Sequence, residues 1–316
     1  METHDASSTS AAVAWLKGLS LGEPQQLDPY TIYPVCVKEA GPDPHLLLTH
    51  QAIGAQVLEI LEKGEGEVQE LDAFNKGDQP VVILEGDTLV GCKQNRVVAR
   101  SVILGRGGKV SIPVGCMEQG RWAWTSGHFQ SGPMRISPSV RGASTREVLE
   151  AKKHRRPRTS VDQSRLWADV VCCLDESSVA TPTSDYHALI DERGDEARER
   201  SRALERHPGQ VGVLVTAGGD FLGLELTGHP ETWDELADRT LPALLMDRMW
   251  APEISTRKRG RRPKASTWLR RVQRAQITLT PGLGQGQDID VENGSLAGSG
   301  LWHDDQVVHL AVFANR

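Results

Sequence analysis

Residues 88–116 read TLVGCKQNRVVARSVILGRGGKVSIPVGC, and this stretch decides the fold class. Short runs rich in Val and Ile, which favour strands, are separated by turns made of Gly, Lys and Asn. Similar runs lie at 68–71 and 81–84, and a spacing of about eight to twelve residues predicts an antiparallel meander in a sandwich or barrel. Four polar residues, Lys93–Arg96, interrupt the stretch and form either a solvated turn or a polar site.

The rest of the chain predicts a mixture of helices and strands. Helices are expected over 11–19, 50–64, 145–153, 161–174, 186–206, 230–250 and 268–275, although 57–60 also fits a strand. Further strands are expected at 30–37, in a hairpin over 209–226, and at 276–279 and 307–313, while residues 1–10 are expected to be disordered. We therefore predict an α+β fold within one domain over 21–316. Its antiparallel β-rich part covers 21–140 and its mixed part covers 141–316, after a disordered or short-helical segment over 1–20.

The composition indicates a globular protein of the cytoplasm. The chain has 316 residues and a net charge of −6, so it is not a polycation built for nucleic acid. It contains no apolar run of membrane-spanning length and no signal peptide at its start. The five cysteines include no C-x-x-C pair, which favours a reduced, cytoplasmic setting.

Glu118 is the candidate catalytic residue. In the expected strand 109–116, Val110 and Cys116 face the same apolar side, and continuing the alternation places Glu118 on that side too. A carboxylate there needs a cation or hydrogen-bond donors, and Arg121 follows three residues later. Such a pair would line a polar pocket, with Glu118 as a base or as a group that orients a ligand. Alternatively, the strand has already ended and the pair lies in an exposed turn.

The polar turn is the second candidate. Lys93 and Arg96 would supply charge to a phosphate or carboxylate, and Gln94 and Asn95 would supply directional amide hydrogen bonds. The alternative is a polar turn that faces water.

A simple residue count connects these two candidates. If the chain reverses near Gly107, Arg100 pairs near Val114 and Arg96 near Glu118. The two polar segments would then face each other across neighbouring strands.

Aromatic residues and one helix supply the remaining candidates. Trp122 would stack on a base or sugar ring, or Trp122 and Trp124 would simply cover the edge of a core. Gln163 and Trp167 lie on one face of the helix expected over 161–174, where they would either reach into the site or pack at a seam.

Several kinds of site are not expected. The histidines and cysteines show no metal-ligand spacing, and no phosphate-binding or nucleotide-binding glycine motif is present, so no metal and no cofactor are predicted. The basic runs 152–158 and 255–264 are better explained as solvated loop charges than as a nucleic-acid surface.

The order of these motifs is similar to that of a known family. Residues 84–124 resemble the core of the ARG and Rhodanese-Phosphatase-superfamily-associated Protein domain, an uncharacterised bacterial domain. Segments at 21–35, 161–170, 209–226 and 308–313 extend the resemblance over most of 20–316. The positions that match the family pattern are Gly91, Lys93, Gln94, Asn95, Arg96, Cys116, Glu118, Gly120, Arg121, Trp122, Asp162, Gln163 and Trp167.

The resemblance implies a link to NAD or ADP-ribose metabolism, or to a bacterial conflict system, because the family is named for its genomic neighbours. Two hypotheses follow. In the first, the domain binds or processes a phosphorylated, ribose-containing small molecule such as a nucleotide or ADP-ribose. In the second, it is a non-catalytic interaction or structural module whose Glu–Arg–Gln network is a buried polar core. An open pocket favours the first hypothesis, and a network closed to water favours the second.

Overall fold

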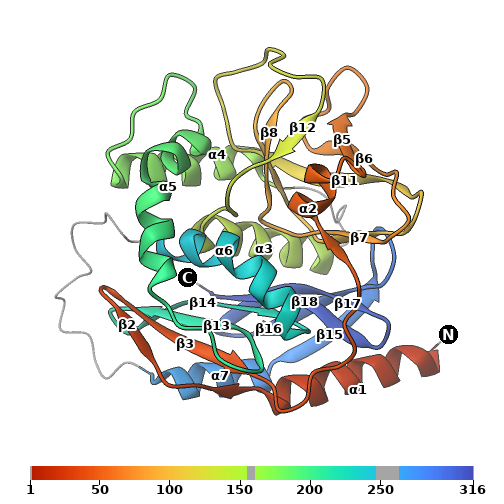
Figure 1. Cartoon of the computed structure of the whole chain (residues 1–316), viewed down its shortest axis with the longest axis vertical. Helices are drawn as coiled ribbons and strands as arrows, with labels where there is room; N and C mark the ends of the chain where they lie inside the picture. The colour runs from red at the N-terminus through yellow and green to blue at the C-terminus, as the bar shows by residue number, and fades with distance from the viewer. Residues whose placement is uncertain (1, 155–160, 247–262, 316) are drawn as a thin grey trace. The chain divides into compact units, whose positions relative to one another are not determined.

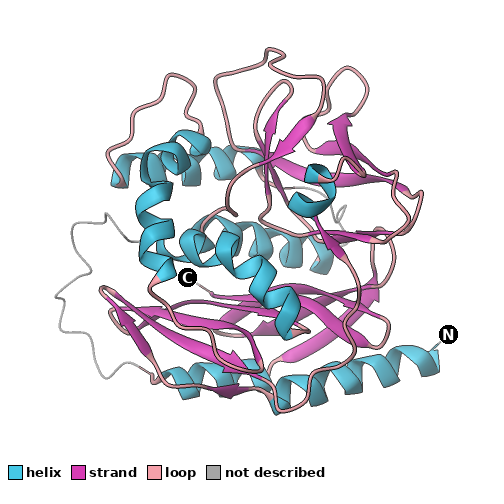
Figure 2. Cartoon of the chain, viewed as in Figure 1, coloured by secondary structure: helices cyan, strands magenta, loops and turns pink. Residues whose placement is uncertain are grey.

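The computed structural model describes residues 2–154, 161–246 and 263–315. Their contacts group the chain into two compact units. The first unit comprises 1–44, 197–281 and 286–316, and the second comprises 45–196 and 282–285. The α+β class is confirmed, because helices accompany extensive antiparallel sheets (Figure 2). The expectation of one domain over 21–316 stays a prediction.

The first unit is built on a nine-stranded antiparallel sheet with the order β1-β3-β13-β14-β18-β17-β16-β15, in which β2 also pairs with β3 (Figure 1). Its strands are β1 (Ser20–Leu21), β2 (Gln25–Leu27), β3 (Tyr30–Cys36), β13 (Gln210–Ala217), β14 (Asp220–Thr227), β15 (Gln276–Pro281), β16 (Gln287–Asn293), β17 (Leu296–His303) and β18 (Gln306–Ala314). The expected hairpin over 209–226 is confirmed as β13 and β14, which turn at Gly218 and Gly219, both with positive φ.

Helices cover both faces of this sheet. Alternation along β13 explains this arrangement, because Leu214 packs in the core that contains α1 (Glu2–Gly18) and α7 (Ala265–Gln273). Its neighbour Val213 packs in a separate core with α6 (Pro230–Met246). Successive residues of a strand point to opposite faces, so each face has its own apolar layer.

The second unit carries the candidate site and contains a six-stranded sheet with the order β12-β8-β9-β11-β6-β5. The two end strands, β12 and β5, approach each other, so the sheet nearly closes into a barrel. Its strands are β5 (Leu58–Glu62), β6 (Glu70–Asn75), β8 (Thr88–Gly91), β9 (Arg96–Val98), β11 (Lys109–Cys116) and β12 (Phe129–Ser131). A smaller sheet consists of β10 (Val102–Leu104), β7 (Val81–Ile83) and β4 (Leu47–Leu48). The helices are α2 (Thr49–Gly54), α3 (Pro138–Lys153), α4 (Gln163–Glu176) and α5 (Tyr186–Arg202), the last of which continues into the first unit.

Several expected elements differ from the structure. The helix expected over 50–64 ends at Gly54. The alternative of a strand at 57–60 is confirmed, because 58–62 forms β5, in which Leu58 and Ile60 alternate with half-buried residues. The Val- and Ile-rich run from 96 to 104, part of the stretch that predicts the meander, is broken at 99–101, so that β9 and β10 belong to different sheets. Residues 2–10 are helical rather than disordered, because α1 begins at Glu2. The strands β16 and β17 occupy residues for which no strand is expected from the sequence.

Three expectations fall partly outside the described residues. The helix expected over 230–250 is described only through residue 246, the basic run 152–158 only through residue 154, and the run 255–264 only from residue 263. None of the described helices is long and apolar enough to cross a membrane.

Candidate functional site

The turn between β8 and β9 is shaped by its own residues. Gly91 has a φ of +123°, and a Cβ added there would lie 2.4 Å from Ser126 Oγ, so this position requires glycine. Cys92 follows with a φ of +45°, in the left-handed region. The side chain of Asn95 closes the turn, because its Oδ1 accepts a hydrogen bond of 3.0 Å from the Gly91 backbone N–H. The turn is therefore a defined structure rather than a solvated loop.

Glu118 is buried and bound by donors. The Glu118 residue is only 4% exposed to solvent. Arg121 Nε lies 2.9 Å from both carboxylate oxygens, and Arg121 Nη2 lies 2.6 Å from Oε2. The backbone N–H of Asn95 donates a further hydrogen bond of 3.1 Å to Oε2. The expected Glu118–Arg121 pair thus exists, and it is an inward-facing pair rather than an exposed one.

Arg121 also joins two loops. Its Nη1 donates to the carbonyl oxygens of Cys92 at 2.8 Å and Ala123 at 3.0 Å, and to Thr125 Oγ1 at 3.2 Å. Its Nη2 lies 3.2 Å from Asn95 Oδ1. One guanidinium group therefore fixes the β8–β9 turn against residues 121–125, which we call the tryptophan loop.

Arg96 has a different partner from the one expected. The strand register places Arg96 opposite Cys116 rather than Glu118, because β9 begins at Arg96 and its Val98 pairs with Val114. The expected pairing of Arg100 near Val114 is therefore also wrong: the chain does not make one simple hairpin at Gly107, since β10 leaves for the smaller sheet.

The Arg96 side chain is fully buried and surrounded by polar groups. Its Nη1 donates to Gln94 Oε1 at 2.8 Å and contacts Cys116 Sγ. Its Nη2 lies 3.5 Å from Glu62 Oε2 in a buried ion pair. The Cys116 thiol also donates to Gln94 Oε1, at 3.0 Å. Arg96 and Gln94 thus serve as internal partners of the fold.

We call Glu62, Gln94, Asn95, Arg96, Cys116, Glu118 and Arg121 the polar network. Sequence reasoning missed Glu62, although the alternation of Leu58, Ile60 and Glu62 along β5 places its side chain on the buried face. It also missed Asp185, whose Oδ2 accepts a hydrogen bond of 2.8 Å from Asn95 Nδ2. No local sequence signal connects Asp185 to a turn that is 90 residues away.

Burial changes the acidity of several groups beside the network. It raises the pKa of the Cys116 thiol to about 11, against the opposing effect of the Arg96 charge. It also raises the pKa of the Cys92 thiol to about 11. The pKa of Asp185 is raised, chiefly by burial. Both thiols are consequently protonated near neutral pH and are poor nucleophiles.

The Gln163 side chain hydrogen-bonds to the backbone of β11. Its Oε1 accepts from the Cys116 backbone N–H at 2.8 Å, and its Nε2 donates to the Cys116 carbonyl oxygen at 2.8 Å. Asp162 caps α4 by accepting from the backbone N–H groups of Ser164 and Arg165. Trp167 is half-buried on the next turn of α4, and its Nε1 has no hydrogen-bond partner among the described residues.

Lys93 and the tryptophans form the exposed side of the site. The residue exposures of Trp122 and Trp124 are 50% and 56%, and they are among the most exposed large apolar residues in the described part of the chain. Lys93 Nζ lies 5.1 Å from the centroid of the Trp122 ring and 5.3 Å from that of Trp124. Arg96 Cζ lies 5.8 Å from the Trp122 centroid, so this ring also covers the buried guanidinium.

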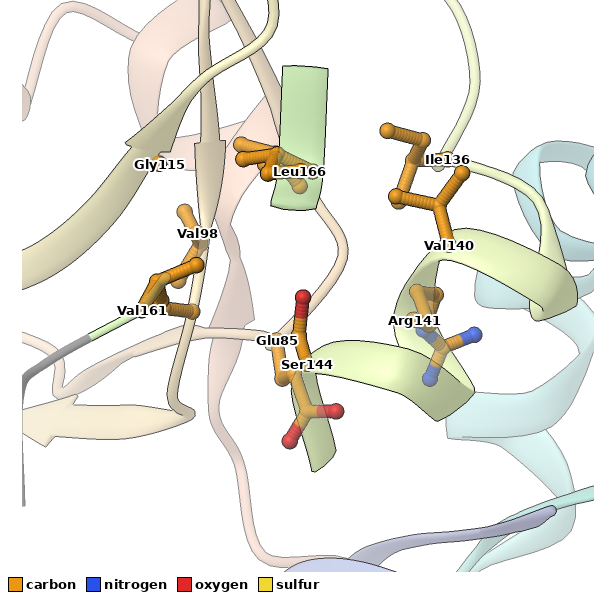
Figure 3. A pocket seen from close by; sticks show the side chains of 11 residues that line it. Glu85, Val98, Gly115, Ile136, Val140, Arg141, Ser144, Val161 and Leu166 are labelled. Carbon is orange, nitrogen blue, oxygen red and sulfur yellow. The ribbon is translucent and has the colours of Figure 1, made fainter. Parts of the chain in front are cut away.

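A small cavity lies elsewhere in the second unit (Figure 3). Its walls come from β9, β11, α3 and the start of α4, and most of its lining is apolar, with Glu85 and Arg141 as the charged members. The free volume is ≈ 10 Å³, which is room for about one water molecule. A cavity of this size does not admit a ribose or a nucleotide.

The chain matches a known family over almost its whole length. A family model of the ARG and Rhodanese-Phosphatase-superfamily-associated Protein domain matches residues 18–313. The chain belongs to this family. Membership extends across both units, and it confirms the resemblance expected from the motifs around residues 91–122. Neither a curated protein nor a solved structure with significant similarity was found.

Proposed function

We propose that this protein is a non-catalytic binding module. In this proposal the polar network is a structural core, and the tryptophan loop with Lys93 is the binding surface. The observation that carries the proposal is the state of Glu118, whose carboxylate is buried and held by Arg121 and by the Asn95 N–H.

The bonding of Glu118 argues against a role as base. A general base must reach the proton that it removes, within hydrogen-bond distance of a substrate. Here the donors of Arg121 and Asn95 already occupy the carboxylate oxygens. Releasing Glu118 to a substrate would separate the carboxylate from its cation, and a buried charge without its partner is strongly destabilising. The hydrogen-bonded Glu118–Arg121 pair is therefore better suited to stabilising the fold than to catalysis.

The exposed aromatic surface supports the binding part of the proposal. Exposed apolar side chains that cluster on one surface are typical of interaction sites. Trp122 and Trp124 come from the same short loop, and Arg121 anchors that loop to the network. The buried network would thus hold a recognition surface in place.

A second candidate function is binding of a nucleotide or an ADP-ribose-like molecule, in NAD or ADP-ribose metabolism or in a conflict system. One observation favours it: a base can stack on an exposed Trp ring while the nearby Lys93 ammonium contacts a phosphate. The family's description, which associates the domain with ARG and rhodanese-phosphatase proteins, also supports nucleotide or ADP-ribose binding.

Thermal-shift titration with ADP-ribose, NAD and AMP separates the two candidates. A ligand that binds the folded state stabilises it and raises the melting temperature. The binding-module proposal predicts that none of these three compounds binds, and therefore that none gives a saturable rise in melting temperature. A rise that disappears in Trp124→Ala but persists in Glu118→Gln supports nucleotide binding at the surface. A rise or a turnover that requires Glu118 contradicts the structural role of the network.

We also infer that the protein is cytoplasmic. All five cysteines, at positions 36, 92, 116, 172 and 173, are free thiols in the structure, which supports a reducing compartment. Cell fractionation with antibody detection tests this location, and recovery outside the cytoplasmic fraction would contradict it.

A further inference from the structure

Lys93 occupies a three-sided ammonium site made by its own chain. Two sides are the rings of Trp122 and Trp124, whose centroids lie 5.1 and 5.3 Å from Nζ. The third side is the backbone carbonyl oxygen of Glu65, which accepts a hydrogen bond from Nζ. Aromatic faces attract cations within about 6 Å of the ring centroid, so all three sides favour positive charge.

The loop beside this site is shaped to the ammonium group. Gly66 has a φ of +107°, and a Cβ added there would lie 3.1 Å from Lys93 Nζ and 3.4 Å from Trp122 Cζ2. A side chain at this position would press on both the cation and the ring. Glycine at position 66 therefore leaves room for the Lys93 ammonium beside the Glu65 carbonyl oxygen.

Charges around the site also favour a cation. Glu65 and Glu67 are exposed on the same loop. Lys63 lies 3.6 Å from Glu67 Oε2 and also pairs with Glu70, so it offsets part of this charge. Exposed acidic residues on the loop that supplies the carbonyl oxygen favour an amine over the phosphates of a nucleotide.

We propose that Trp122, Trp124 and the Glu65 carbonyl form a binding site for an alkylammonium group, and that Lys93 is its resident occupant. The partner is a peptide that presents a lysine or N-methylated lysine side chain, which takes the place of the Lys93 ammonium. This inference rests on the proposed binding role of the tryptophan loop and names the chemistry that the loop recognises.

Competition by Lys93 has a measurable consequence. A ligand binds only the fraction of molecules in which Lys93 has left the site, so the resident ammonium weakens the apparent affinity by that fraction. Removing the ammonium should strengthen binding of an external cation. Removing one ring should weaken it by about two- to five-fold, as expected for a single exposed cation–π contact.

The experiment titrates methylammonium, which keeps N–H donors for the Glu65 carbonyl oxygen, and then a tripeptide with a central monomethyl-lysine, into the full chain at constant ionic strength. Lys93→Met keeps the apolar stem of the side chain, and Lys93→Ser removes the stem as well. Indole N–H resonances of Trp122 and Trp124 report binding. We expect either variant to bind about ten-fold more tightly than the wild type. Adding Trp124→Ala should reverse part of this gain, whereas adding Val68→Ala, at an exposed apolar position outside the site, should not.

Two results would overturn the proposal: equal affinity of the wild type and the Lys93 variants, or a gain that Trp124→Ala leaves intact. A wild-type response to AMP that is lost in the Lys93 variants would instead assign the surface to an anion. None of these outcomes bears on Glu118, so failure of the ammonium site is distinguishable from failure of the structural role of the network.

Discussion

Arg121 binds Glu118 from three residues away, with Nη2 at 2.6 Å and Nε at 2.9 Å from Glu118 Oε2. The same guanidinium also reaches the Cys92 carbonyl oxygen on the neighbouring turn. A short sequence spacing therefore produces a link between two separate loops, and the buried carboxylate depends on it for neutralisation.

Arg121→Ala should lower the free energy of unfolding by about 3–5 kcal/mol, because it leaves the Glu118 charge buried without its cation. Adding Glu118→Gln should recover part of the loss by removing that charge. Urea denaturation of the single and double variants measures both effects. Glu150→Gln, which breaks the exposed pair with Lys153, is the control and should cost no more than about 1 kcal/mol.

Gly91→Ala should destabilise the protein by about 1–3 kcal/mol or more, because it adds backbone strain and a clash with Ser126 Oγ. Gly127→Ala in the adjoining loop is the matched control, since a Cβ there meets no atom within 4 Å. Thermal denaturation compares the two variants. Equal melting temperatures would show that the turn relaxes without cost.

Iodoacetamide should modify Cys172 well before Cys92 and Cys116. Cys172 is exposed, whereas burial removes the other two from solvent and raises the pKa of each to about 11. Only the thiolate reacts, so protection should persist at pH 8 and disappear in urea. Peptide mass spectrometry over time provides the measurement. Early labelling of Cys116 would show that the network opens in the native state.

Asp185 should make stability depend on pH. Burial raises its pKa above the ordinary value of 3.8, so the folded state holds this proton more tightly than the unfolded state. The contribution of Asp185 to stability is therefore most favourable below about pH 4 and decreases as pH rises through its folded pKa. Asp185→Asn should remove this decrease from the stability profile. The exposed Asp175→Asn serves as control and should leave the profile unchanged.

The sequence predicted the strands better than the partners of their side chains. Alternation at 109–116 located β11 and correctly directed Glu118 inward. The same reasoning failed for Arg96, because the residue count assumed one continuous hairpin while 99–101 divert the chain into a second sheet. Strand periodicity is local, but pairing depends on which sheet each strand joins.

Contacts between residues that are far apart in the sequence could not be predicted from local patterns. Asp185 lies 90 residues after Asn95, and Gln163 lies 47 residues after Cys116, so only the fold brings these partners together. Glu62 was hidden for another reason. The alternative strand at 57–60 stopped two residues short of it, and the helix expected over 50–64 gave residue 62 no buried strand face. The glycine requirement at Gly91 likewise depends on Ser126, which the turn sequence does not contain.

The paired hydrogen bonds between Gln163 and Cys116 have a consequence for the buried end of a central strand. At the end of β11, the Cys116 N–H and carbonyl oxygen on the side facing away from β9 both bind the Gln163 amide. A primary amide has the same donor and acceptor as a peptide group, so Gln163 takes the place that another strand would fill. A buried backbone N–H or carbonyl oxygen without a partner costs free energy comparable to a lost hydrogen bond. One side chain on α4 thus completes the backbone hydrogen bonding of a central strand at the point where β6 no longer pairs with it.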